Sequence, residues 1–124
     1  VDIDKFKQIN DTYGHQVGDD VLRKVGRILR VEIRINDLCF RYGGEEFVIL
    51  LPETPKHHAH VVAEKLRAVI ERSALLPESQ QVCTASFGVS TLAKQEEWQE
   101  MLSRADRALY QAKNSGRNRV SLSY

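Results

Sequence analysis

The sequence is short of the features that mark membrane, disulfide-rich and nucleic-acid-binding proteins. Its longest apolar stretch, 47–51, is far below the roughly 18 residues that a membrane span needs. The two cysteines form no CxxC pair, so we expect both to be small buried hydrophobic residues. Lysine plus arginine number 18 against 17 aspartate plus glutamate, which gives no argument for a nucleic-acid or membrane partner. We expect a cytoplasmic domain and leave membrane anchoring of a parent protein open.

The size and composition that remain suit one globular domain. The chain has 124 residues, of which 42% are hydrophobic and 28% charged, enough for a single core. The sequence runs directly from Val1 into Asp2-Ile3-Asp4. We therefore interpret residues 1–124 as one domain whose first strand and preceding segment are cut short.

Hydrophobic periodicity divides the chain into helices and strands. Helical spacing predicts helices over 18–34, after Pro55 and over 98–112, with Pro77 in a polar loop after the second helix. Alternation predicts a strand at the start of the chain and further strands over 38–42, 47–51, 82–92 and 119–124. Residues 43–46 form the predicted hairpin turn, in which glycine can take positive φ. This order predicts an α+β fold, a mostly antiparallel central sheet with flanking helices.

Four carboxylates stand out, two at the end of the first strand and two on the glycine turn, where neither a core nor a helix requires them. Asp2 and Asp4 end the first strand and point to the same side of an extended chain, whereas Glu45 and Glu46 are adjacent on the glycine turn. Taken alone, Asp4 would be a helix cap. If the first strand lies beside the turn, Asp2 meets Glu45 or Glu46, and such like charges repel unless a cation lies between them. Carboxylate oxygens with room for water suit Mg²⁺.

Basic residues occur where such a cluster could meet a phosphate. Backbone N–H groups around Lys5 and Phe6 would face an anion at the strand-to-helix turn, and Lys7 adds charge. Lys113 and Arg117 lie at the glycine-capped end of the third predicted helix. They either complement the helix dipole or reach a phosphate tail, and both interpretations can hold together.

Four segments together resemble the GGDEF domain of bacterial diguanylate cyclases. They are DIDKFKQINDTYGHQVGD at 2–19, RYGGEEF at 41–47, SFGVS at 86–90 and ADRALYQAKNSGRN at 105–118. The resemblance is collinear over residues 1–124 and lacks the N-terminal part of the family's domain, including its D-x-L-T-G-L-x-N-R segment. It implies a palm-like nucleotidyl cyclase fold with a ferredoxin-like βαββαβ core. It also implies a nucleotidyltransferase that condenses two GTP into cyclic di-GMP and two pyrophosphates.

The resemblance implies a metal and catalytic set at the carboxylates. By position, Asp2, the carbonyl of Ile3 and Glu45 are similar to the ligands of Mg²⁺ or Mn²⁺, two ions per active site. Glu46 either assists the metals or accepts the proton of the attacking hydroxyl, a choice that stays open. Lys7 is similar to the residue that stabilises charge at the reacting phosphate.

The same resemblance implies a set of substrate-binding residues. This set comprises Asn10 and Asp19 for guanine, Phe6 and His15 in the same contact stretch, and Lys113 and Arg117 for the β- and γ-phosphates. A carboxylate suits guanine because it accepts from N1–H and N2–H, which adenine does not offer. One domain would hold one GTP, so the resemblance implies a homodimer in which each copy supplies the other's nucleophile. We expect the isolated chain to be mainly monomeric and weakly active.

A second site is implied near the turn. Arg34 and Asp37 form an RxxD pattern that, without context, would be a weak solvated ion pair. The resemblance implies that this pair is an inhibitory site for the product, cyclic di-GMP. Lys65 is the nearby basic helper, and a lysine lacks arginine's bidentate fork.

Two other functions stay open, and two other patterns have ordinary interpretations. The chain could be a non-catalytic module that binds GTP or cyclic di-GMP, or a relaxed cyclase that also accepts ATP, which Asp19 disfavours. His57, His58 and His60 fit a solvated helix face better than a soft-metal site. Trp98 we expect in the core.

Overall fold

The computed structural model describes residues 1–76 and 81–124, so Pro77 and its predicted loop lie outside the described residues. The strands are β1 (Asp2–Ile3), β2 (Leu38–Arg41), β3 (Phe47–Leu50), β4 (Ala85–Val89) and β5 (Val120–Leu122). The helices are α1 (Phe6–Tyr13), α2 (His15–Glu32), α3 (Lys56–Arg72) and α4 (Trp98–Asn114). The predicted elements are present, but periodicity missed α1, and α2 begins at His15, three residues before the predicted start.

The strands form one continuous surface in the order β2, β3, β1, β4, β5. β1 pairs antiparallel with β4, and β4 pairs parallel with β5, while β2 and β3 form an antiparallel hairpin. A bridge between Asp2 and Glu46 joins the hairpin to β1, supported by a hydrogen bond of 3.2 Å from the Ile3 amide to the Glu45 carbonyl. The mostly antiparallel sheet predicted from the sequence is confirmed.

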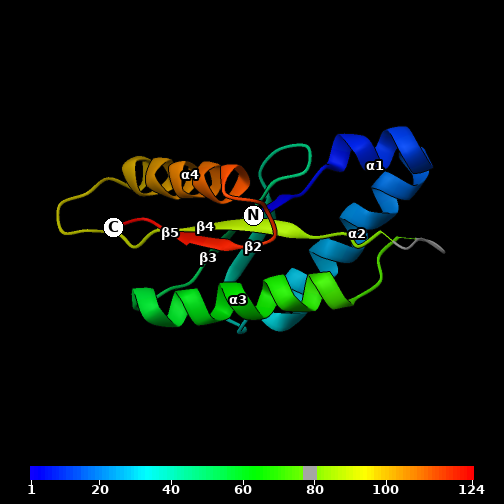
Figure 1. Cartoon of the computed structure of the whole chain (residues 1–124). Helices are drawn as coiled ribbons and strands as arrows, with labels where there is room; N and C mark the ends of the chain where they lie inside the picture. The colour runs from blue at the N-terminus through cyan, green and yellow to red at the C-terminus, as the bar shows by residue number, and fades with distance from the viewer. Residues whose placement is uncertain (77–80) are drawn as a thin grey trace.

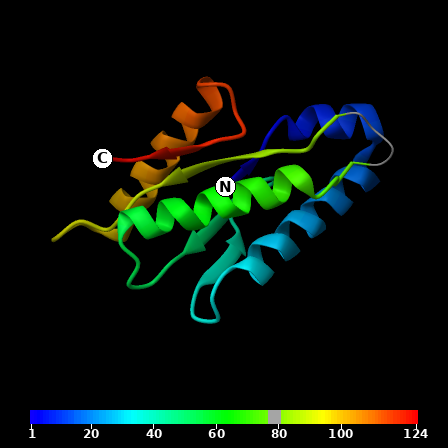
Figure 2. The same cartoon turned by 60° about the horizontal axis from the view of Figure 1, so that its bottom comes forward.

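Helices cover the two faces of the β1-β4-β5 sheet. Figure 1 shows α4 on one face and α3 on the other, with α1 and α2 at the end where the chain turns back from β1. Figure 2 shows α2 running past α3 toward the hairpin. The most buried large side chains come from these layers: Ile3, Val21, Val25, Leu29, Leu66 and Ile70. Burial of these apolar faces is the main favourable term that holds the helices to the sheet.

Helix α4 lies unusually close to β4 at Gly88. A methyl carbon added to Gly88 would lie 2.1 Å from the carbonyl oxygen of Ala105 and 2.4 Å from the amide nitrogen of Leu109. Both of these atoms belong to the helix backbone, which cannot rotate away as a side chain can. Glycine is therefore required here by space, and the close approach fixes where α4 rests on the sheet.

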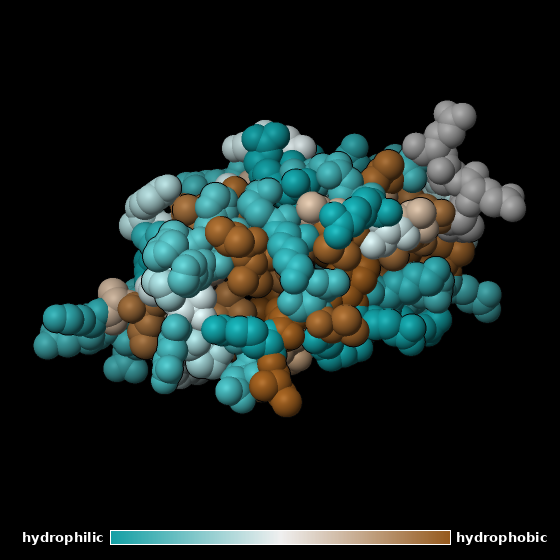
Figure 3. Space-filling model, turned by 90° about the horizontal axis from the view of Figure 1, so that it is seen from below, coloured by the Kyte–Doolittle hydropathy of each residue, from teal (hydrophilic) through white to brown (hydrophobic). Residues whose placement is uncertain are grey.

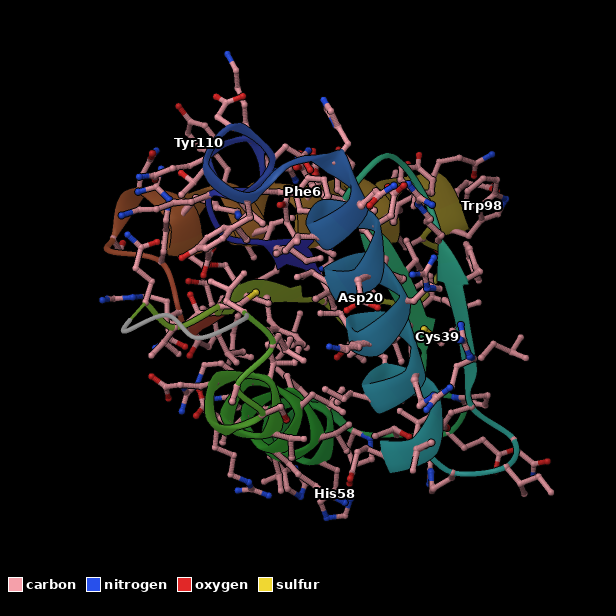
Figure 4. All side chains as sticks on the ribbon, turned by 90° about the vertical axis from the view of Figure 1, so that its right-hand side faces the viewer. Phe6, Asp20, Cys39, His58, Trp98 and Tyr110 are labelled. Carbon is pink, nitrogen blue, oxygen red and sulfur yellow. The ribbon has the colours of Figure 1, made fainter. Side chains whose placement is uncertain are left out.

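The burial of Trp98 and of the two cysteines can be compared with the sequence-based expectations. Trp98 is 62% exposed, so the expectation of core packing is wrong: the side chain lies on the outer side of α4 (Figure 4). Cys83 is buried as predicted, whereas Cys39 is only half-buried, between α2 and the hairpin (Figure 4).

The rest of the surface mixes polar and apolar residues. His57 and His58 are exposed at the start of α3. Figure 3 shows a face on which hydrophobic patches are bordered by hydrophilic residues. Among the described residues, none of the helices is both long and apolar enough to cross a membrane.

Candidate active site

The end of β1 lies against the hairpin bend, Gly43–Glu46. Besides the Asp2–Glu46 bridge, the Phe47 amide donates to the Val1 carbonyl at 2.8 Å, so the two segments are joined on both sides of the bridge. Figure 1 shows the bend rising beside the start of the chain. Burial and the neighbouring charge of Asp2 raise the pKa of Glu45 above its ordinary value. The carboxylates that the sequence predicted to meet therefore do share one rim of the sheet.

A lysine ammonium group lies among the oxygens at this rim. Lys113 Nζ is 3.1 Å from Asp2 Oδ1 and 2.9 Å from Asp4 Oδ1, and it also lies 3.4 Å from the carbonyl oxygen of Ile3. A cation is thus held where backbone and side-chain oxygens converge. These are hard donors of the kind that Mg²⁺ prefers, so the chemistry of Asp2, the Ile3 carbonyl and Glu45, though not a preformed cluster, suits a divalent ion. Within the described residues, clusters of three or more His, Cys, Asp or Glu side chains able to hold a metal are absent.

Asp4 is the buried centre of this region and not a helix cap. The first residue before α1 is Lys5, in the left-handed conformation with φ 55°, and no side chain caps this helix. Asp4 instead accepts hydrogen bonds from Thr84 Oγ1 and Ser86 Oγ, each at 2.7 Å, in addition to Lys113. Burial opposes its charge, but the hydrogen bonds from Ser86, Lys113 and Thr84 prevail and lower the pKa of Asp4. The capping interpretation is therefore wrong.

The loop after α4 is fixed by a residue that the sequence analysis did not single out. Asn118 donates its backbone N–H to Asp4 Oδ2 at 2.9 Å, and its side chain bonds Arg67 Nη1 at 2.9 Å and Glu71 Oε2 at 2.7 Å on α3. The segment 116–118 has three successive positive φ values, 123°, 65° and 47°. Asn118 thus ties a strained loop, which carries Arg117, both to the rim and to α3.

The signals for Asp4 and its partners were present but weak. Thr84 and Ser86 are polar at alternate positions of an otherwise apolar strand, and both face Asp4. Such alternation indicates that the two side chains point to the same side of the strand and have a polar partner there. The identity of that partner depends on strand pairing. Asn118 had no comparable signal, because its partners come from α3, 47 and 51 residues away.

Neither backbone conformation nor contact with neighbouring protein atoms requires the glycines of the bend. Within the described residues, the glycines with positive φ are Gly14 and Gly116, so the expected positive φ at the bend is wrong. A methyl group at Gly44 would meet nothing within 4 Å, and at Gly43 only the Glu46 Cβ at 4.0 Å. Arg41 holds the bend by donating to the carbonyl oxygens of Gly43 and Gly44, the shortest bond being 2.6 Å. Arg41 thus fixes the bend, and the backbone of Gly43 and Gly44 beside Glu45 is not covered by side chains of the described residues.

Asn10, one of the two residues predicted to read guanine, lies where α1 meets α2, beside the turn of α2 that carries the other, Asp19. Asn10 on α1 packs against Gly18 on α2, the neighbour of Asp19. Phe6 lies at the same junction (Figure 4), with its ring 3.4 Å from the Cβ position of Gly18. Asp19 is exposed, and so is His15 at the start of α2. An amide and a carboxylate therefore lie on adjacent surfaces beside an aromatic ring.

The remaining predicted substrate residues are placed at the edges of this region. Lys7 is exposed on α1. Arg117 is exposed, and within the described residues its guanidinium makes no hydrogen bond or ion pair, whereas Lys113 is engaged with the carboxylates. A cavity of about 220 Å³ is lined by Lys5, Arg117 and ten other residues, with Asp2 and Glu45 not among the described residues that line it. This cavity therefore lies beside Lys5 and Arg117, on the α1 and α4 side of Asp4, and does not include the rim at Asp2 and Glu45.

The RxxD pair forms a more ordered corner than a solvated ion pair. Arg34 Nε and Nη2 bond the two carboxylate oxygens of Asp37 at 3.1 and 2.9 Å. The Asp37 side chain is only 2% exposed, and Arg34 lowers the pKa of that carboxyl through hydrogen bonding that outweighs burial. Arg34 also donates to Thr54 Oγ1 at 2.6 Å, while Lys65 pairs with Glu32 at 3.1 Å.

Comparisons with known proteins agree with the resemblance. The family described as "Diguanylate cyclase, GGDEF domain" matches residues 1–119. Diguanylate cyclase A from Treponema denticola is 44% identical over 99% of this chain and 34% of that protein. Diguanylate cyclase DgcM from Escherichia coli is 47% identical over 97% of this chain and 29% of that protein. The chain therefore spans about a third of the length of these curated relatives.

Solved structures have the same fold. The active GGEEF domain of a diguanylate cyclase from Vibrio cholerae has a TM-score of 0.91 at 35% identity, covering 99% of this chain and 79% of that chain. The GGDEF domain of DgcB from Caulobacter crescentus, in complex with c-di-GMP, also has a TM-score of 0.91 at 35% identity, covering 98% and 74%. With the family match over residues 1–119, these relatives show that the chain belongs to the GGDEF domain family of diguanylate cyclases.

Proposed function

We propose that this domain is a diguanylate cyclase that condenses two GTP molecules into cyclic di-GMP and two pyrophosphates. The observation that carries the proposal is the contact between the end of β1 and the bend, which brings Asp2, the Ile3 carbonyl and Glu45 to one rim. Membership of the family and 44–47% identity to two named cyclases support it.

In this proposal the rim binds Mg²⁺ or Mn²⁺, two ions per site, through Asp2, the Ile3 carbonyl and Glu45. When bound, the metal offsets charge on the α-phosphate and lowers the pKa of the attacking 3′-hydroxyl. The 3′-oxygen of one GTP forms a bond to the α-phosphorus of the other, and pyrophosphate leaves. The hydroxyl proton passes to Glu46 or to solvent. A second, symmetric attack closes the ring.

The chain's cations and polar groups orient the nucleotide. Lys113 lies at the rim in the last turn of α4 and Arg117 on the loop that follows, so both can meet the β- and γ-phosphates, while Lys7 approaches from α1. Asn10 and Asp19 flank the guanine, with Asp19 accepting from N1–H and N2–H. Phe6 and His15 complete this contact surface. Asp19 would leave acceptors unpaired against adenine, which disfavours ATP.

Catalysis requires two copies of the domain. One domain holds one GTP, so the attacking 3′-hydroxyl comes from a second GTP held by a facing copy. Orienting two reactants in this way can supply about 7–11 kcal/mol of the barrier reduction. We expect the rate with GTP and Mg²⁺ to rise more steeply than linearly with protein concentration. A rate strictly proportional to protein would exclude the two-copy mechanism.

The decisive experiment is incubation with GTP and Mg²⁺, followed by chromatography of the nucleotides. Wild type should yield cyclic di-GMP and Glu45→Ala none, because Glu45 is the bend's metal ligand. Glu100→Ala, an exposed carboxylate on α4, is the matched control and should match wild type. GTP binding without product in wild type would favour the alternative, a non-catalytic module that binds GTP or cyclic di-GMP.

We also propose that the product inhibits the enzyme at Arg34 and Asp37. The support is an arginine held in place by a buried carboxylate, with part of its guanidinium still exposed, which suits a phosphate of cyclic di-GMP. Calorimetric titration of cyclic di-GMP should show weaker binding to Arg34→Ala than to wild type. Arg23→Ala, an exposed arginine on α2 that pairs with Asp20, is the control. Equal affinity in all three proteins would end this part of the proposal.

A further inference from the structure

The side chain of Asn10 lies directly on the backbone of α2 at Gly18. A methyl carbon added to Gly18 would lie 1.8 Å from Asn10 Oδ1 and 2.9 Å from its Cγ, separations that no pair of non-bonded atoms tolerates. Alanine at position 18 would therefore have to displace the Asn10 amide. The Phe6 ring, at 3.4 Å, would stay in ordinary contact.

Helix geometry does not explain a glycine at this position. Gly18 is the fourth residue of α2, and among the described glycines the positive φ values belong to Gly14 and Gly116. Alanine is a better residue than glycine in a helix interior. The remaining reason for glycine is the room that it leaves for Asn10.

The packing also orients the amide. Asn10 Oδ1 is buried and has no hydrogen-bond partner among the described residues, which is rare for a buried polar atom. Its neighbour is the Gly18 backbone, so the oxygen end points into the α1–α2 junction. The Nδ2 group is then the end of the amide left for a ligand. It can donate to an acceptor of the guanine ring, while the adjacent Asp19 accepts from the ring.

We propose that Gly18 is a positioning residue that holds the Asn10 amide in the orientation that reads guanine. The inference rests on the proposed function insofar as Asn10 binds the base. It has two separable parts: Gly18 sets the position of the Asn10 side chain, and that position sets the affinity for GTP.

The test is Gly18→Ala, with Gly26→Ala in the same helix as its matched control. A methyl group at Gly26 would meet its nearest atoms, Arg30 Nη1 and Phe47 Cε1, at 3.4 and 3.5 Å, which is ordinary contact. Both variants should melt at or above the wild-type temperature, because Asn10 can rotate away and alanine favours the helix. Only Gly18→Ala should raise the KM for GTP, about five- to tenfold, as for the loss of one hydrogen bond to substrate.

Two further measurements separate positioning from a general structural effect. In the nucleotide-free protein, the Asn10 side-chain amide resonances should move in Gly18→Ala and stay in place in Gly26→Ala. In an Asn10→Ala background, Gly18→Ala should no longer change the KM for GTP. A KM increase that persists in that background, or unmoved Asn10 resonances, would overturn the inference. If wild type bound no GTP at all, the proposed function would fail, and the resonances would still decide the positioning.

Discussion

The two acidic segments at the rim, the end of β1 and the bend, differ in the hydrogen-bond partners of their carboxylates and in the direction of their pKa shifts. At the end of β1, Asp4 accepts from Thr84, Ser86, Lys113 and the backbone of Asn118, and its pKa is lowered because these bonds outweigh burial. In the bend, the side chains of Glu45 and Glu46 make no hydrogen bond or ion pair within the described residues. Burial and the charge of Asp2 raise the pKa of Glu45.

The difference concerns how the negative charge is neutralised. Folding alone neutralises the carboxylates at the end of β1, whereas those of the bend lack a partner among the described residues and would need a bound cation. The β1 end is neutralised by the protein's own lysine, so its carboxylates contribute to stability. The bend keeps carboxylates in mutual repulsion, an arrangement that is unfavourable until a cation arrives. Strain or repulsion of this kind is characteristic of functional sites.

The same chemical change in the two segments should have different outcomes. Asp4→Asn removes the charged acceptor of a buried lysine pair, so we expect the free energy of unfolding to fall by about 3 kcal/mol. Glu45→Gln loses no partner and should stay within about 0.5 kcal/mol of wild type. Urea denaturation followed by circular dichroism measures both. Equal losses would contradict the comparison.

The β1 end also depends on α3 through Asn118. Asn118→Ala removes the side-chain bonds to Arg67 and Glu71 and forces alanine to φ 47°, so we expect a loss of about 2 kcal/mol in unfolding free energy. Asn118→Gly keeps the left-handed backbone accessible and isolates the side-chain part. If both variants were as stable as wild type, the anchor on α3 would be unimportant.

Acid should protonate Glu45 in the bend first and should weaken the β1 end only at lower pH. A carboxyl whose pKa is lowered by folding adds stability above its unfolded value, near 3.8 for Asp4, and this stability is lost as pH falls through the lowered pKa. Glu45, with a raised pKa, has the opposite sign and takes up its proton earlier. Unfolding free energies measured from pH 6 down to pH 2 should fall, and less steeply in Asp4→Asn. An identical pH dependence in the variant would contradict this assignment.

The smallest expected effect is stabilisation by metal alone. Mg²⁺ at ten times its dissociation constant should stabilise the nucleotide-free protein by about 1.4 kcal/mol. Glu45→Gln should lose most of this gain, since it weakens the ligand that we propose in the bend, and Glu100→Gln should keep it. Thermal melts with and without EDTA are the measurement. A full magnesium effect in Glu45→Gln would remove Glu45 from the metal site.

The sequence predicted the elements well because hydrophobic periodicity is local. It also brought Asp2 and the bend together, by way of the resemblance and the expected repulsion of like charges. It missed the role of Asp4, because burial of that carboxylate depends on the register that places Ser86 of β4 opposite Asp2. Trp98 was misplaced because helical spacing identifies an apolar stripe but not which of its end residues lie beyond the neighbouring strand.

The close packing of α4 on Gly88 also affects the rim, because Lys113 belongs to the same helix. Lys113 follows Ala105 by eight residues, which is about 12 Å along α4. The backbone of α4 packs directly on Gly88, and this contact fixes the position of the helix along β4. Gly88 therefore also determines where the Lys113 ammonium group lies, although the two residues are not in contact. A larger residue at position 88 would push α4 away from β4, and the Lys113 ammonium group would move out of hydrogen-bond distance of the Asp2 and Asp4 oxygens that it now bridges.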